Sequence, residues 1–116
     1  MAAKQDITIK QGADFVLALQ WQDSDATPID LTGHSIRMQV RTAVSSPTVA
    51  LELTTDNNRI VITDAVNGMF ELRLGNAETS ALNIPAGVYD IEIVSPTNIV
   101  DRVLQGRVFN SLEVTR

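Results

Sequence analysis

The amino-acid sequence predicts an all-β sandwich, and three observations support this prediction. Apolar residues recur with period two along most of the chain, which is typical of strands that bury one face. Turn signals separate these segments at roughly ten-residue intervals, the spacing expected of a sandwich or a small barrel. The composition is 44% hydrophobic but only 4% aromatic, which suits a core of β-branched and leucine side chains.

The length and the cysteine content favour one self-sufficient domain. A chain of 116 residues is long enough to bury a core without covalent staples, so we expect a single domain over residues 1–116. The sequence contains no cysteine. Neither a disulfide framework nor a thiolate metal site is therefore expected.

The strands can be placed in order from the alternation of apolar residues. The clearest is residues 14–22, where Phe15, Leu17 and Leu19 share one face. Asn67-Gly68 is a two-residue hairpin signal between two later strands. The seven or eight expected strands cover residues 6–10, 14–22, 35–42, 49–54, 60–62, 70–74, 88–94 and 99–109.

Two positions interrupt this pattern. Asn76 is a suitable N-cap for one helical turn over residues 77–82, the helical candidate in the sequence. Gly106 lies inside the last expected strand, where a glycine indicates a β-bulge or the close approach of another backbone segment.

Residues 82–94 indicate which kind of sandwich this is. Leu82 ends a short polar segment, the chain turns through Gly87, and a strand follows with the one tyrosine, Tyr89, near its start. Immunoglobulin-like sandwiches use such a tyrosine corner: the ring packs in the core and the hydroxyl bonds to the backbone a few residues upstream. We therefore expect an immunoglobulin-like antiparallel β-sandwich of seven to eight strands with one short helical turn. Replacement of Gly87 by a β-branched residue should be costly if this position has a positive φ.

Charge and hydropathy bear on the classes of partner. The net charge is −5, from 14 acidic and 9 basic residues, and no basic run offers the clustered charge that phosphate backbones require. No apolar run resembles a signal peptide or approaches the roughly 18–20 residues that span a bilayer. We expect a protein made in the cytoplasm that binds neither nucleic acid nor membrane.

The residues that could carry chemistry are few. His34 is the one histidine, and its position at a strand entry does not identify a catalytic partner. Asp23, Asp25 and Asp30 share a loop, but their spacing does not match a calcium-binding loop. Trp21 could stack on a sugar in a carbohydrate-binding module, although alternation places its ring in the core. We expect no enzyme activity, no catalytic or metal-ligating residue and no cofactor.

Two segments resemble a known family. The first is residues 11–41, with a Gly-Ala-Asp entry to the strand that contains Phe15, followed by Thr-Pro-Ile-Asp-Leu-Thr-Gly over residues 27–33. The second is residues 86–116, from Ala-Gly-Val-Tyr-Asp to the terminal Glu-Val-Thr-Arg. Together they resemble the immunoglobulin-like N-terminal domain of upper baseplate proteins of tailed bacteriophages, and small phage virion proteins of similar length.

This resemblance implies a structural component of a tailed phage particle, in the neck, tail or baseplate, that acts as an adaptor or anchors a fibre. A capsid decoration protein is an alternative, as is a carbohydrate-binding sandwich. The expected location is the virion, after synthesis in the bacterial host cytoplasm, and the expected partners are other virion proteins in a symmetric multimer. Termini, loops and sheet edges would make the contacts. The candidate contact residues are Lys4, Gln5, Asp6, Asp23, Asp25, Leu112, Val114 and Arg116.

Overall fold

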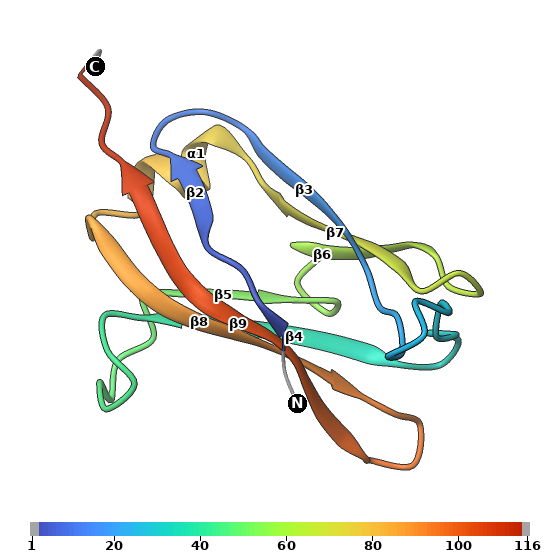
Figure 1. Ribbon diagram of the computed structural model, residues 1–116. Helices are drawn as coiled ribbons and strands as arrows, with labels where there is room; N and C mark the ends of the chain where they lie inside the picture. The colour runs from blue at the N-terminus through green and yellow to red at the C-terminus, as the bar shows by residue number, and fades with distance from the viewer. Residues whose placement is uncertain (1–2, 115–116) are drawn as a thin grey trace.

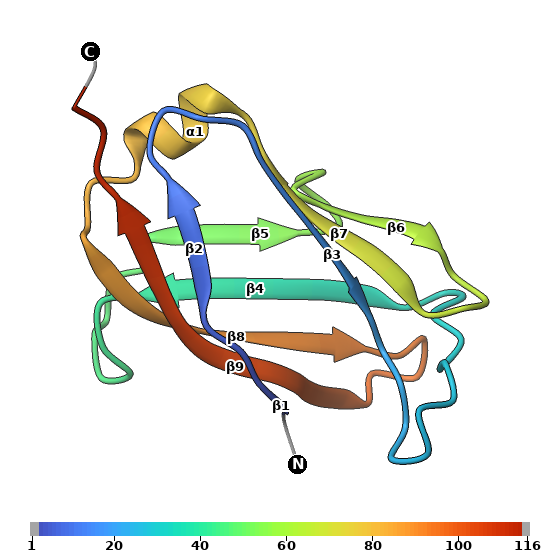
Figure 2. The same ribbon diagram turned by 45° about the horizontal axis from the view of Figure 1, so that its top comes forward.

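The computed structural model describes residues 3–114, and this part of the chain forms nine strands and one short helix. The strands pack as two layers, with the helix closing one end (Figures 1 and 2). The elements are β1 (Ala3–Lys4), β2 (Ile7–Lys10), β3 (Phe15–Gln20), β4 (Ser35–Arg41), β5 (Leu51–Thr54), β6 (Ile60–Asp64), β7 (Met69–Leu74), α1 (Asn76–Ala81), β8 (Ala86–Val94) and β9 (Val100–Ser111).

One layer is a six-stranded sheet and the other a three-stranded sheet. The larger sheet has the order β1-β9-β8-β4-β5, with β2 also paired to β9, and the smaller has the order β3-β7-β6. All pairings within the smaller sheet are antiparallel, as are those among β9, β8, β4 and β5. No helix in residues 3–114 is long and apolar enough to cross a membrane.

The pairing of the N-terminal strands differs from the expected all-antiparallel arrangement. Both β1 and β2 run parallel to β9, with Ala3 opposite Leu104 and Ile7 opposite Val108. The N-terminal strands β1 and β2 therefore lie beside the last strand, β9, at one edge of the six-stranded sheet, while the two ends of the described chain lie at opposite ends of the molecule (Figure 2). Strand β1 was not predicted, because its two exposed residues carry no alternating pattern.

The core lies between the sheets and follows the predicted alternation. In β4, Ile36, Met38 and Val40 are each no more than 2% exposed, whereas the residues between them face solvent or lie partly exposed. The same alternation buries every second residue of β8. The inward residues of β3 are only half-buried, because β3 is an edge strand of the smaller sheet.

Two local predictions need correction. The helix begins one residue earlier than expected, at Asn76, with Gly75 as the N-cap. Asn76 is the first helical residue rather than the N-cap. The Asp14 carboxylate, which lies outside the helix, accepts its N–H at 2.8 Å and so satisfies one of the donors that a helix start leaves free. The β6–β7 hairpin has a four-residue loop, residues 65–68, rather than a two-residue one. Gly68 ends this loop with φ +68°.

The predicted tyrosine corner is confirmed for the burial of the ring, but the predicted hydrogen-bond partner of the hydroxyl is wrong. Leu82 and Tyr89 are both 4% exposed. The Tyr89 hydroxyl does not bond to the backbone just upstream; it donates to the carbonyl oxygen of Gln5 at 2.6 Å. Strand β1 has brought that carbonyl to the edge of the sheet, where the tyrosine reaches it. The corner residue therefore anchors the N-terminal segment.

Gly87 is needed for space rather than for a positive φ. Its backbone is not in the left-handed region, so the condition of a positive φ is not met. A Cβ at this position would instead lie 2.6 Å from the Arg41 carbonyl oxygen. Gly106 fulfils its prediction of a close approach, because a Cβ there would overlap the Gln5 carbonyl. The β-bulge in β9 falls nearby, at Val103, between the pairs of Leu104 with Ile91 and Arg102 with Glu92.

Candidate interaction surface

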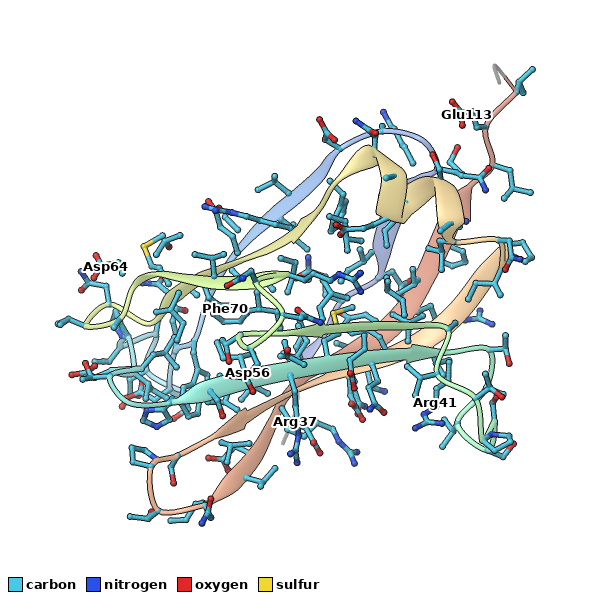
Figure 3. The ribbon with its side chains drawn as sticks, turned by 180° about the vertical axis from the view of Figure 1, so that it is seen from behind. Arg37, Arg41, Asp56, Asp64, Phe70 and Glu113 are labelled. Carbon is cyan, nitrogen blue, oxygen red and sulfur yellow. The ribbon has the colours of Figure 1, made fainter. Side chains whose placement is uncertain are left out.

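The outer face of the six-stranded sheet carries several charged side chains. Residues of β4, β8 and β9 that alternate with the core residues stand in three cross-strand rows. In Figure 3, Phe70 lies between the sheets, and Arg37 and Arg41 lie on the far side of β4 from it. The rows are Arg41, Val88 and Arg107; Gln39, Asp90 and Gln105; and Arg37, Glu92 and Arg102.

Two arginines on this face are paired with carboxylates. Arg37 Nε lies 2.8 Å from Glu92 Oε1, and Arg102 Nε lies 3.5 Å from Asp90 Oδ2. All four side chains are substantially solvent-exposed. Each pair therefore contributes at most about 1 kcal/mol to stability, and the face is not held together by these charges.

Two other arginines have different neighbours. The Arg41 guanidinium donates to the Ser46 carbonyl oxygen at 2.8 Å and to Gln39 Oε1 at 2.9 Å. The Arg107 guanidinium lies 5.9 Å from the centroid of the Phe109 ring. Within residues 3–114, no carboxylate lies within ion-pair distance of either guanidinium. Both positive charges remain available to an external anion.

These arginines line a shallow hollow of about 430 Å³, which we call the basic pocket. Its charged lining residues are Lys4, Arg41, Arg102, Arg107 and Asp90, so four positive charges face one negative charge. Val88 and the exposed side chain of Val44 add apolar surface. The pocket concentrates positive charge on a chain whose net charge is −5.

Sequence reasoning did not find the basic pocket. Arg41, Arg102 and Arg107 are isolated basic residues in two strands, and none belongs to a basic run. The strand register brings them together, since β8 lies between β4 and β9. The available signal was an outward-facing arginine near the end of each strand, which has meaning only once the strand order is known.

His34 and Trp21, the two residues considered for catalysis and sugar binding, contact each other. Their ring centroids are 6.1 Å apart at an interplanar angle of 72°. Trp21 is half-buried against the core, which leaves less of its face open to a sugar than a stacking platform needs. His34 Nδ1 lies 3.1 Å from the Thr32 carbonyl oxygen. These contacts give both rings a packing role at the end of the sandwich.

Two of the three loop aspartates considered as calcium ligands, Asp23 and Asp30, stabilise local turns. Asp23 Oδ1 accepts the N–H groups of Asp25 and Thr27 at 2.9 and 3.0 Å. The hydroxyl and N–H of Thr32 lower the pKa of Asp30, with a smaller contribution from His34. No group of three or more potential metal-ligating side chains gathers in residues 3–114.

The predicted contact residues near the N-terminus lie against the body of the protein. Lys4 pairs with Gln105 in the sheet, the Gln5 N–H donates to the Gln105 carbonyl at 2.9 Å, and Asp6 Oδ1 accepts the Arg107 N–H at 3.1 Å. The backbone of residues 4–6 is therefore docked on the sandwich while their side chains remain exposed, and a partner contact at these residues stays a prediction.

The predicted contacts near the C-terminus are open to solvent where they are described. Leu112 is 55% exposed and Val114 is 91% exposed, and the chain here leads away from the sandwich (Figure 1). Arg116 lies outside the described residues. A partner contact at these positions stays a prediction.

We expect Tyr89→Phe to lower the free energy of unfolding by about 1–3 kcal/mol, because it leaves the Gln5 carbonyl without its hydrogen-bond donor. Urea denaturation of the two proteins measures the difference. An unchanged midpoint would contradict the assigned hydrogen bond.

The same tyrosine predicts a loss of stability at alkaline pH. Burial, with a smaller contribution from the Asp6 charge, raises the pKa of Tyr89 from 10.0 to about 12. Between these values the unfolded chain releases a proton that the folded chain retains, so stability falls as pH rises. The contribution is fully present below pH 10 and is lost as pH passes 12. We expect the stability advantage over Tyr89→Phe to shrink across this interval in urea titrations. A constant difference would argue against a buried hydroxyl.

Comparisons with known proteins support the fold. No family model and no curated protein matches the sequence. Among solved structures, a chain from the crystal structure of ICOS in complex with ICOS-L and an anti ICOS-L VNAR domain aligns with a TM-score of 0.50 and 17% identity. This alignment covers 97% of our chain and 56% of that chain.

Two further structures align less closely. Tim-1 has a TM-score of 0.45 and 10% identity, with 100% of this chain and 99% of that chain covered. The ZIG-8–RIG-5 IG1–IG1 heterodimer has a TM-score of 0.44 and 18% identity, with 92% and 83% covered. The protein is an all-β immunoglobulin-like sandwich, as predicted from its sequence. Likenesses at this level of identity identify the fold alone.

Proposed function

We propose that this protein is a structural component of a tailed bacteriophage particle, an adaptor or fibre-anchoring module of the neck, tail or baseplate. It acts through protein contacts and not through catalysis. The phage assignment depends on the resemblance of residues 11–41 and 86–116 to baseplate domains. The observation that carries the assembly role is the basic pocket, where Arg41 and Arg107 face solvent without a carboxylate partner in the described chain.

Solvent exposure at both sequence ends supports contact with neighbouring subunits. The apolar side chains of Leu112 and Val114 extend beyond the end of β9. A partner surface that covers them would gain the free energy of burying apolar area, roughly 25 cal/mol per Å². A capsid decoration protein would use the same surfaces and would differ in its partner and copy number.

Quantitative mass spectrometry of purified phage particles from the source tests this proposal. A copy number that matches tail symmetry would support the neck, tail or baseplate. A copy number that follows the major capsid protein would contradict the neck, tail or baseplate assignment and would favour a capsid decoration protein. Absence from particles would overturn both, and glycan-array binding that Trp21→Ala abolishes would then favour the carbohydrate-binding alternative.

A further inference from the structure

One end of the sandwich is uniformly acidic. It consists of residues 20–34, 63–69 and 94–100, which contain no lysine or arginine. Hydrogen bonds join the first two segments: the Leu31 N–H donates to the Ala65 carbonyl at 2.8 Å, and the Trp21 N–H to the Gly68 carbonyl at 2.9 Å. Gly33 lies beside Pro96 of the third segment. We call this region the acidic end. Its charged residues are Asp23, Asp25, Asp30 and Asp64.

The basic pocket lies toward the opposite end of the molecule. Strand β4 connects the two regions, since it starts at Ser35, just after the acidic end, and finishes at Arg41 in the pocket. A strand of this length places the two about 20 Å apart. Figure 3 shows Asp64 and Arg41 at opposite ends of the sandwich, whose longest dimension is 42 Å.

Charge is therefore separated along the long axis of the protein. Four carboxylates lie near the basic pocket, and each has a partner: Asp90 pairs with Arg102, Glu92 pairs with Arg37, Asp6 accepts the Arg107 N–H, and Glu52 accepts a hydrogen bond from Gln39. They leave the guanidinium groups of Arg41 and Arg107 uncompensated.

Exposed apolar side chains accompany the charges at both ends. Val44 is 88% exposed at the basic pocket. Val66 is 67% exposed and Ile99 is 61% exposed at the acidic end. Specific interfaces combine an apolar centre with complementary charges around it. Each end offers exposed apolar side chains together with charges of one sign, and the signs at the two ends are opposite.

We propose that the acidic end of one copy of this protein binds the basic pocket of the next copy. The contact is heterologous, because two different surfaces meet, so each copy retains one free surface of each kind. Such contacts generate a closed ring when the rotation between copies permits it, and a filament when it does not. The inference deepens the proposed function and rests on it for the biological setting, a symmetric assembly within a particle.

Charge reversal on either surface tests the contact. Lys4→Glu with Arg107→Glu alters the basic pocket at two exposed side chains, and leaves Arg41 in place to hold Ser46. Asp25→Lys with Asp64→Lys alters the acidic end at two exposed carboxylates, of which Asp64 accepts one solvent-exposed hydrogen bond, from the Asn67 side chain. Lys10→Glu with Arg73→Glu is the control, since it also changes the net charge from −5 to −9 but acts on neither surface.

Sedimentation velocity then measures self-association at about 20 mM and about 0.5 M salt, where screening lengths differ several-fold. We expect the unaltered protein and the control to associate at low salt and to dissociate at high salt. Each surface variant should weaken association at least tenfold. A protein that stays monomeric at about 0.1 mM in low salt, or a control as weakened as the surface variants, would overturn the proposal.

Mixing the two surface variants gives the decisive result. The pocket of the acidic-end variant and the acidic end of the pocket variant are both intact, so an equimolar mixture should form dimers that cannot extend. No heterodimer, with both variants folded by circular dichroism, would overturn the head-to-tail contact. Failure here with the protein present in purified particles would leave the proposed function standing. If the protein associated in solution but were absent from particles, the head-to-tail contact would stand and the proposed function would be overturned.

Discussion

Gly106→Ala is expected to lower the free energy of unfolding by about 2–5 kcal/mol, the sum of overpacking and a lost buried hydrogen bond. A Cβ at this position would overlap the carbonyl oxygen of Gln5. That carbonyl belongs to the backbone, so a side-chain rotation cannot relieve the overlap. Residues 3–5 would have to leave β9, and the Tyr89 hydroxyl would lose its acceptor.

Urea denaturation of the purified variant measures this effect. Gly75→Ala is the matched control, because a Cβ there would lie 3.8 Å from its nearest neighbour, a carboxylate oxygen of Glu78. Gly75 is an N-cap, where alanine is a poor substitute, so a cost of up to about 1 kcal/mol is expected for the control. If Gly106→Ala cost no more than the control, the approach of β1 to β9 would be wrong.

The alternation of apolar residues predicted most of the fold, because burial of one strand face is a local property of the sequence. Residues 35–42 show this well: Ile36, Met38 and Val40 were expected inside and are buried. Strand ends were less predictable. Residues 49 and 50 continue the alternation of β5, yet the strand begins at Leu51, since pairing also needs a partner, and β4 ends at Arg41.

Contacts between distant segments could not be predicted in the same way. Tyr89 was identified as a buried corner from its local context, and the ring is buried. Its hydroxyl partner, Gln5, is 84 residues away and reaches the corner through the parallel pairing of β1 with β9. The basic pocket has the same origin, because Arg41 and Arg107 become neighbours through strand order. Sequence alone identified Tyr89 but neither its hydrogen-bond partner nor the arginines of the basic pocket.

Thr79 was not singled out in the sequence, yet it connects the helix to the turn between β2 and β3. Its side chain is fully buried, at 0% exposed. The hydroxyl donates to the Ala13 carbonyl at 2.8 Å and accepts the Gly12 N–H at 3.0 Å. A single hydroxyl thus serves one backbone donor and one backbone acceptor in part-buried hydrogen bonds, and it holds α1 against the N-terminal part of the sandwich.

Thr79→Val is expected to cost about 2–4 kcal/mol, because a methyl group of nearly the same size leaves both backbone groups without a partner. Thr8→Val is the matched control: Thr8 is exposed on β2, and a surface change of this kind usually stays within about 0.5 kcal/mol. Hydrogen exchange locates the effect, since the Gly12 N–H should lose protection in Thr79→Val more than amides in the centre of β4 do. Equal losses at both places would mean that the substitution weakens the whole sandwich rather than the attachment of the helix.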